Sequence, residues 1–72
     1  GVLLCDLKPG QTARIVAAAG KAAKRLAALG FVPGTRVRAE QPAPGGDPCV
    51  YSLRGYTVAM RRALAEEVEV KE

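Results

Sequence analysis

The side chains that could carry chemistry in this chain are few and widely separated. The chain has no histidine, its two cysteines stand at Cys5 and Cys49, and its seven acidic residues are scattered. Catalytic triads and most zinc sites depend on histidine or on closely spaced cysteines. A ferrous site likewise needs histidine, carboxylate or thiolate groups in one cluster. The sequence therefore predicts neither an enzyme nor a bound metal or cofactor.

Basic side chains are the remaining candidates for a functional role. Lysine and arginine number 11 against 7 acidic residues, which gives a net charge of +4. Lys21, Lys24 and Arg25 fall on one side of a predicted helix, and Val32 follows that helix closely. We expect this basic face to bind an acidic partner surface, with Val32 as an exposed apolar rim. An ordinary solvated surface is the competing interpretation of the same residues.

A nucleic-acid partner is not expected from the remaining charges. Arg36 and Arg38 share one face of a predicted strand, but Glu40 continues that face with the opposite charge. The chain has only one Phe and two Tyr, too few for a platform on which bases could stack. No segment has the pattern of a recognition helix.

The two cysteines and the length of the apolar runs indicate the cellular compartment of the protein. Cys5 and Cys49 have no ligand spacing, so we expect two buried free thiols, although their number would also allow a disulfide. The segment Gly1–Asp6 lacks the basic region of a signal peptide. The longest apolar run, Ile15–Ala19, is far shorter than the roughly 20 residues of a membrane span. We therefore expect a cytoplasmic protein that reaches a membrane only through its partner.

Turns predicted from the sequence separate the helix and strands that position these residues. Lys8–Gln11 and Val32–Thr35 both read x-Pro-Gly-x, the pattern of a type II turn with glycine at a positive φ. Between them, apolar residues recur at helical spacing and predict a helix over residues 20–29. Gly30 is expected to end this helix in the left-handed C′ position, with Phe31 contacting Leu26.

Alternating apolar residues predict five strands. Val37 and Ala39 are expected to point inward, and Ala13, Ile15 and Ala17 form the alternating set of an earlier strand. A single helical turn is expected before the last strand, and the proline-rich segment 41–48 is expected to be a loop. The predicted strands are Thr12–Ala17, Thr35–Glu40, Cys49–Arg54, Thr57–Arg61 and Glu67–Lys71, with a tight reversal at Gly55–Tyr56.

These elements predict a mainly β fold that forms one domain over residues 1–72. A chain of 72 residues can bury only one small core. A curled five-stranded barrel with one inserted helix would leave few open sheet edges.

Several ordered motifs resemble the FeoA family, ferrous iron transport protein A, across nearly the whole chain. The most specific block is Leu-x-x-Leu-Gly-Phe-x-Pro-Gly at residues 26–34, preceded by a Leu-x-Pro-Gly block at 7–10. Asp47-Pro48 and Arg54-Gly55-Tyr56 follow in the same order. The resemblance implies an SH3-like barrel with an inserted helix. It also implies a cytosolic accessory protein of bacterial ferrous iron uptake that binds the cytosolic part of the FeoB permease.

Two further interpretations fit the same sequence. A second copy of the chain is another candidate partner for the same surface. The alternative function is an SH3-like regulatory or nucleic-acid-associated module, because the same barrel resembles the C-terminal domain of iron-dependent repressors.

Overall fold

The computed structural model describes residues 2–72, so Gly1, which the expected domain includes, lies outside it. One antiparallel sheet of six strands dominates the described chain, in the order β1-β6-β2-β3-β4-β5. The strands are β1 (Val2–Leu3), β2 (Thr12–Ala18), β3 (Arg36–Ala39), β4 (Cys49–Leu53), β5 (Tyr56–Met60) and β6 (Val68–Lys71). The helices are α1 (Ala23–Ala28) and α2 (Arg62–Ala65), and Leu4–Asp6 and Pro44–Gly46 form short 3₁₀ turns.

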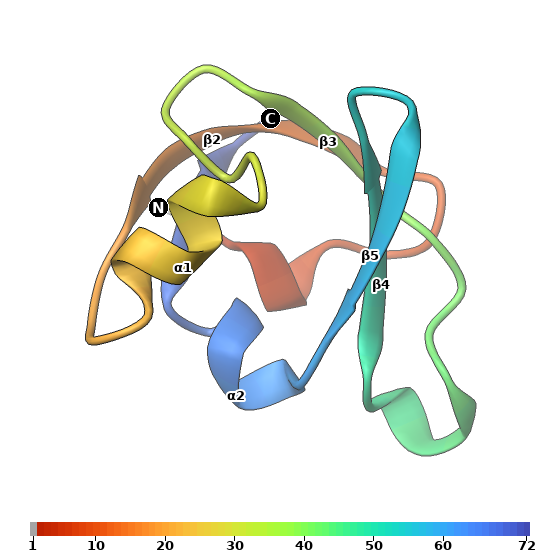
Figure 1. Cartoon of the computed structure of the whole chain (residues 1–72). Coiled ribbons are helices and arrows are strands. Elements are labelled where there is room, and N and C mark those ends of the chain that lie inside the picture. Colours follow the sequence, from red (N-terminus) through yellow and green to blue (C-terminus); the bar gives the residue numbers. More distant parts are fainter. Residues whose placement is uncertain (1) are drawn as a thin grey trace.

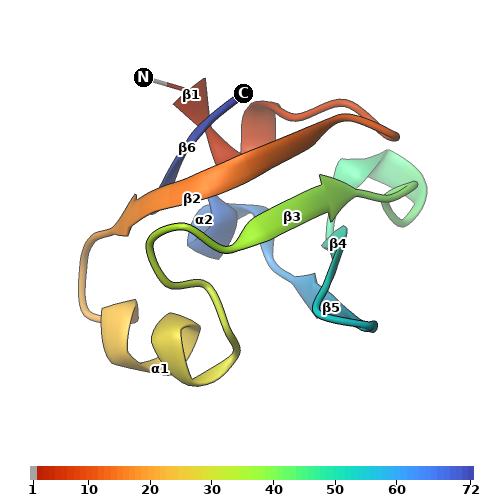
Figure 2. The same ribbon diagram turned by 90° about the horizontal axis from the view of Figure 1, so that it is seen from above.

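The sheet curls around a central core, as Figure 1 shows. Strands β2 and β3 cross one side of the molecule, the β4–β5 hairpin stands on another, and both helices lie across from the hairpin. Seen from above in Figure 2, α1 lies near one end of β2 and β3. The largest fully buried side chains come from strands, helix and turns alike: Phe31, Leu4, Ile15, Leu26, Val37, Val68 and Val70.

The predicted turns and helix end are confirmed. Gly10 and Gly34 have φ values of +90° and +91°, and both turns close by the expected hydrogen bond. Gly30 has a φ of +100°. Its N–H donates to the carbonyl of Ala27, while the N–H of Phe31 donates to the carbonyl of Leu26. This pair of bonds is a Schellman motif, and Phe31 and Leu26 both belong to the buried core.

The inserted helix is shorter than the predicted 20–29. Gly20 has a φ of +78°, and residues 21 and 22 form a turn before α1 begins at Ala23. The reason is local: a left-handed residue cannot be part of a right-handed helix. Lys21 therefore lies in the turn ahead of α1, and only Lys24 and Arg25 are on the helix itself.

The mainly β prediction is confirmed, but the strand number is not, because β1 was not expected. β1 has only two residues and pairs with β6, with Val2 opposite Val70. Such a short strand carries no periodic signal and forms because the far end of the chain offers it a partner. Alternation in β2 also ends early: Ala17 is exposed because a register shift between Ile15 and Ala17 interrupts the pairing with β6.

The hairpin reversal lies one residue earlier than predicted. Arg54 and Gly55 are the two turn residues, with φ values of +51° and +85°, and Tyr56 is already the first residue of β5. Two central residues at positive φ match the twist of the flanking strands. Among residues 2–72, no helix is long and apolar enough to cross a bilayer.

Candidate partner-binding groove

A groove of about 610 Å³ runs between α1, α2 and the end of β5, and we call it the helix groove. Its apolar wall is made of alanine, leucine, methionine and proline, and its rim carries charged side chains. The residues that line it are Lys21, Ala22, Arg25, Leu29, Pro48, Ala59, Met60, Arg61, Ala63, Leu64 and Glu67.

The groove is open because neither helix buries much of its surface. Within α1 only Leu26 is buried, and within α2 only Ala65. Leu29 and Leu64 are half-buried and pack against the core from its edge, while Met60 is buried. Alanines at the remaining positions are too small to close the space between the two helices. The result is a concave apolar surface next to the core, a shape that suits an inserted side chain.

Tyr56 fixes the position of α1 relative to the hairpin. Its hydroxyl donates a hydrogen bond to the carbonyl of Leu29, the C-terminal cap of α1. Gly30 leaves the room for this contact, because a Cβ there would lie 2.5 Å from the Tyr56 oxygen. The sequence pattern places Tyr56 only as a hairpin residue, so the role of this side chain comes from the tertiary structure.

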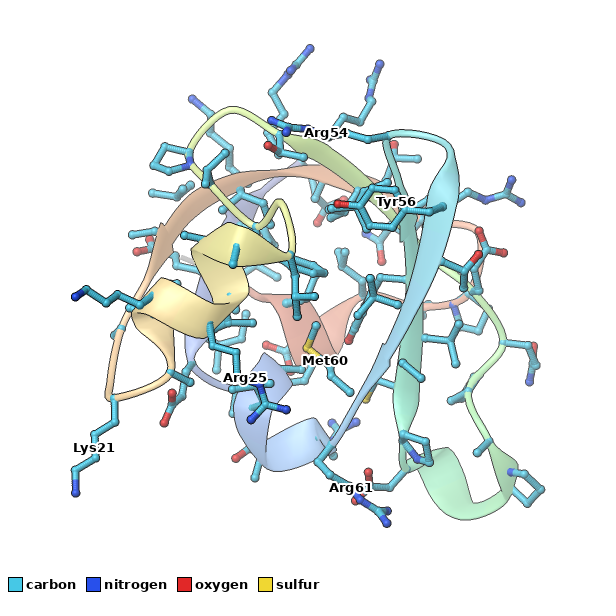
Figure 3. All side chains as sticks on the ribbon, in the orientation of Figure 1. Lys21, Arg25, Arg54, Tyr56, Met60 and Arg61 are labelled. Atoms are coloured by element: carbon cyan, nitrogen blue, oxygen red, sulfur yellow. The ribbon has the colours of Figure 1, made fainter. Side chains whose placement is uncertain are left out.

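The rim of the groove is mainly positive. Arg25 extends from α1 toward α2, while Lys21 projects away from the body of the molecule (Figure 3). Arg61 forms an ion pair with Asp47 at 3.6 Å, and the same Asp47 oxygen accepts the backbone N–H of Arg62 at 3.1 Å. Neither Lys21 nor Arg25 forms an ion pair within residues 2–72. Their charges are therefore available to an incoming acidic group.

The structure brings together half of the residues that the sequence predicted for partner binding. Lys21 and Arg25 line the helix groove. Lys24 is exposed on α1 outside the groove lining, and Val32 is half-buried in the loop after Gly30. Val32 lies outside the groove because the Schellman turn carries the chain away from α2.

Met60, Leu64 and Arg61 also line the groove and were not predicted to do so. They come from the end of β5 and from α2, far along the chain from α1. The only feature of the sequence that points to these residues is the short predicted helical turn, in which Leu64 follows two arginines. This pattern is too common to predict a groove.

The two thiols lie apart from the helix groove. Cys5 and Cys49 are both free and buried, as predicted, and neither lines the groove. Burial raises the pKa of the Cys5 thiol above its ordinary value, with a further contribution from the adjacent Asp6 carboxylate. Cys5 therefore stays protonated at neutral pH, and its thiol is a weak nucleophile. No group of three or more His, Cys, Asp or Glu side chains gathers as a metal site within residues 2–72.

Comparisons with known proteins agree with this architecture. The chain is 37% identical over 70 residues to a fusion of Fe(2+) transport protein A with the Fe(2+) transporter FeoB from Porphyromonas gingivalis. The match covers 94% of this chain and 8% of the fusion protein, so the chain spans a small fraction of that relative's length.

Solved structures share the fold over almost the whole chain. The FeoA protein of Chlorobium tepidum has a TM-score of 0.89 at 35% identity, covering 97% of this chain and 69% of its own. Stenotrophomonas maltophilia FeoA, described as a prokaryotic SH3 domain protein and solved with zinc, has a TM-score of 0.88 at 27% identity, covering 99% and 91%. IdeR of T. acidophilum has a TM-score of 0.82 at 23% identity, covering 97% of this chain and 33% of its own, and the likeness shows the fold alone.

The SH3-like fold predicted from the motifs is thus confirmed. The family model of the FeoA domain matches residues 2–72, which is all but the first residue. Together with the 37% identical relative, this match shows that the chain belongs to the FeoA family.

Proposed function

We propose that this chain is a cytosolic accessory protein of ferrous iron uptake, acting as one domain that binds the cytosolic part of a FeoB-type permease through the helix groove. The observation that carries the proposal is the P. gingivalis relative, in which a FeoA part and a FeoB part form one polypeptide. Fusion holds two modules at a high effective concentration. A FeoA domain that is not fused to its permease must bind it through its own surface contacts.

The helix groove has the composition that such a contact needs. Binding energy in protein interfaces is concentrated in apolar pockets, and surrounding charges steer the encounter. A standard interface covers about 800 Å² on each partner. That area is roughly a fifth of the chain's 4335 Å² surface, so the contact must extend beyond the groove onto α1, where Lys24 lies. We expect an apolar side chain of the partner in the groove and an acidic group near Lys21 and Arg25.

The test is a titration of the labelled chain with the purified cytosolic domain of a FeoB-type permease, with GTP analogue, with GDP and without nucleotide. Lys21→Glu combined with Lys24→Glu should weaken binding at least about tenfold at low salt, because like charges then face each other. Ala63→Tyr should weaken it by filling the groove from an exposed position. Lys8→Glu with Arg62→Glu is the matched control, since it reverses two charges that are neither in the groove lining nor on α1.

Two results would contradict this proposal. One is an absence of binding in every nucleotide state. The other is an equal loss of affinity in the control and in the Lys21 and Lys24 variant, which would show that net charge alone drives the association. A dimer whose dissociation is promoted by Ala63→Tyr would instead identify a second copy of the chain as the occupant of the groove.

The alternative function is a regulatory or nucleic-acid-associated module. It is favoured by the fold shared with IdeR, and that likeness is limited to the fold. A mobility-shift assay with duplex DNA at physiological salt separates the two functions, because accessory binding to a permease predicts no shift.

A further inference from the structure

Three neighbouring strands place like charges directly opposite one another. Arg14 on β2 pairs in register with Arg36 on β3 and, on its other side, with Lys71 on β6. All three residues are exposed. Like charges in directly opposite positions destabilise a sheet. Because this repulsion lowers the stability of the sheet, we expect the three cations to serve as a binding site for an anion outside the molecule.

A fourth cation joins this row at the loop before β3. Arg54 donates from its Nη2 to the Thr35 hydroxyl at 3.1 Å, and Arg14 donates from its Nη1 to the Gly34 carbonyl at 2.9 Å. Both guanidinium groups are thus held in place by neutral oxygen atoms, which leave their charges uncompensated. We call Arg14, Arg36, Arg54 and Lys71 the cationic face.

Acidic side chains compensate two other arginines but none of these four cations. The ion pairs among residues 2–72 are Arg38 with Glu40 at 3.8 Å and Arg61 with Asp47 at 3.6 Å. A shallow hollow of about 360 Å³ is lined by Arg14, Arg36 and Lys71, with Thr12, Ala13 and Glu72 completing it. Glu72 is the acid in this hollow, and one of its oxygens accepts a hydrogen bond from Gln11 at 2.6 Å.

The cationic face and the helix groove point in different directions. Arg54 lies at one extreme of the molecule in Figure 3, while Arg61 of the groove lies at the other. Figure 2 looks down on the side that carries Arg54 and shows β2 and β3 side by side there. One ligand on the groove therefore leaves the cationic face free for a second.

We propose that the cationic face binds the phosphate headgroups of an anionic lipid surface. The choice of a membrane rests on the proposed function, because a chain that binds the cytosolic side of a permease lies within reach of the bilayer. Nucleic acid fits less well: Phe31 and Tyr51 are buried, and the single exposed ring of Tyr56 is too little for a platform on which bases could stack. This proposal departs from the expectation that the chain reaches the membrane only through its partner.

The expected strength is modest and salt-dependent. Each lysine or arginine close to an anionic membrane contributes roughly fivefold in affinity, so four contribute a few hundredfold. Alone, such a contact gives partial binding at about millimolar accessible lipid. It becomes effective when the groove is already bound to a membrane protein, because the second contact is then intramolecular.

The experiment measures flotation of the whole chain with phosphatidylglycerol-rich vesicles, without any permease. Wild type should float with these vesicles at low salt and be released at high salt, and neutral phosphatidylcholine vesicles should not bind it. Arg14→Gln with Arg36→Gln should reduce binding roughly 25-fold, and Lys71→Gln, which breaks no hydrogen bond, roughly fivefold. Lys24→Gln with Arg62→Gln removes two charges outside the cationic face and should reduce it less than fivefold.

Equal losses in the two double variants, or equal binding to neutral vesicles, would overturn the proposal. So would tighter binding to duplex DNA than to the anionic vesicles at the same salt concentration. Circular dichroism of each variant excludes unfolding as the cause, and Lys71→Gln supplies a variant with little effect on the fold. Because the permease fragment is titrated without lipid and the vesicles without permease, either proposal can fail while the other stands.

Discussion

Gly30 is where the end of α1 meets the hairpin, and Gly30→Ala tests whether this contact holds the wall of the helix groove. The residue has a φ of +100°. An added Cβ would lie 2.5 Å from the Tyr56 oxygen and 3.2 Å from Cδ1 of Leu53. Leu53 is buried, so it has little room to move. The alanine must therefore displace Tyr56 or shift the end of α1.

The expected cost has three parts. An alanine in the left-handed region costs about 1–2 kcal/mol. Loss of the Tyr56 hydrogen bond to Leu29 removes about 1 kcal/mol, and a displaced side chain off its rotamer costs up to about 1 kcal/mol. The sum is about 2–4 kcal/mol, against a total stability of about 4–11 kcal/mol for a chain of this length. Gly30→Ala should therefore fold with a large loss of stability.

Gly34→Ala is the matched control. Gly34 has nearly the same φ, +91°, but a Cβ there meets nothing within 4 Å. Only the backbone part of the cost applies, so the control should lose about 1–2 kcal/mol. Urea unfolding followed by circular dichroism measures both variants, with a slope of about 1 kcal/mol per molar urea. The midpoint should fall by about 2–4 M for Gly30→Ala and by about 1–2 M for Gly34→Ala.

A second substitution isolates the contact itself. Tyr56→Phe removes the oxygen that the new Cβ would meet, so it should cost less in the Gly30→Ala background than in wild type. Equal losses for Gly30→Ala and Gly34→Ala, together with additive effects of Tyr56→Phe, would refute the reasoning. In that case Tyr56 would not position α1, and the groove wall would depend on the packing of Leu26 and Leu29 against the core.

Three further predictions concern the core and its titratable groups. Phe31→Ala removes a fully buried ring and should cost about 3–5 kcal/mol in urea unfolding; a loss below 1 kcal/mol would contradict its placement. Tyr51→Phe removes one of the two hydrogen bonds that the Leu4 carbonyl accepts, the other coming from the Leu7 N–H, and should cost about 0.5–1.5 kcal/mol by the same measurement. Burial raises the pKa of Cys5 above its ordinary 9.0, so unfolding favours its ionisation. Its contribution to stability is complete below pH 9 and is lost as pH rises toward the folded pKa. Cys5→Ala should flatten this alkaline decline, and an unchanged slope would show that other groups cause it.

The features that the sequence predicted correctly depend on neighbouring residues. Pro33-Gly34 forms its turn because proline sets one φ and glycine accepts the next. Gly30 ends α1 for the same kind of reason, since its backbone reaches a conformation that other residues avoid. Val37 and Ala39 point inward because successive residues of a strand alternate between its two faces.

The errors lie where the local signal is weak or ambiguous. The helical spacing of the alanines around Lys21 predicts that it lies on the helix, yet Gly20 at positive φ starts a turn instead. The strand Val2–Leu3 has only two residues, too few for an alternating pattern that could predict it. Arg54 adopts a positive φ, which is uncommon for arginine and is therefore not predicted from the sequence. For this reason the hairpin turn lies one position earlier than expected.

The amino-acid sequence by itself determined the mainly β fold, the two Pro-Gly turns, the cap at Gly30, and the absence of histidine. These depend on backbone sterics and on alternation, which act within a few residues. Only the tertiary structure decided that Met60 and Leu64 face α1, and that Arg14 lies between Arg36 and Lys71. Such neighbours are set by the register between strands far apart in the chain and by the packing of the core, and no local pattern records either.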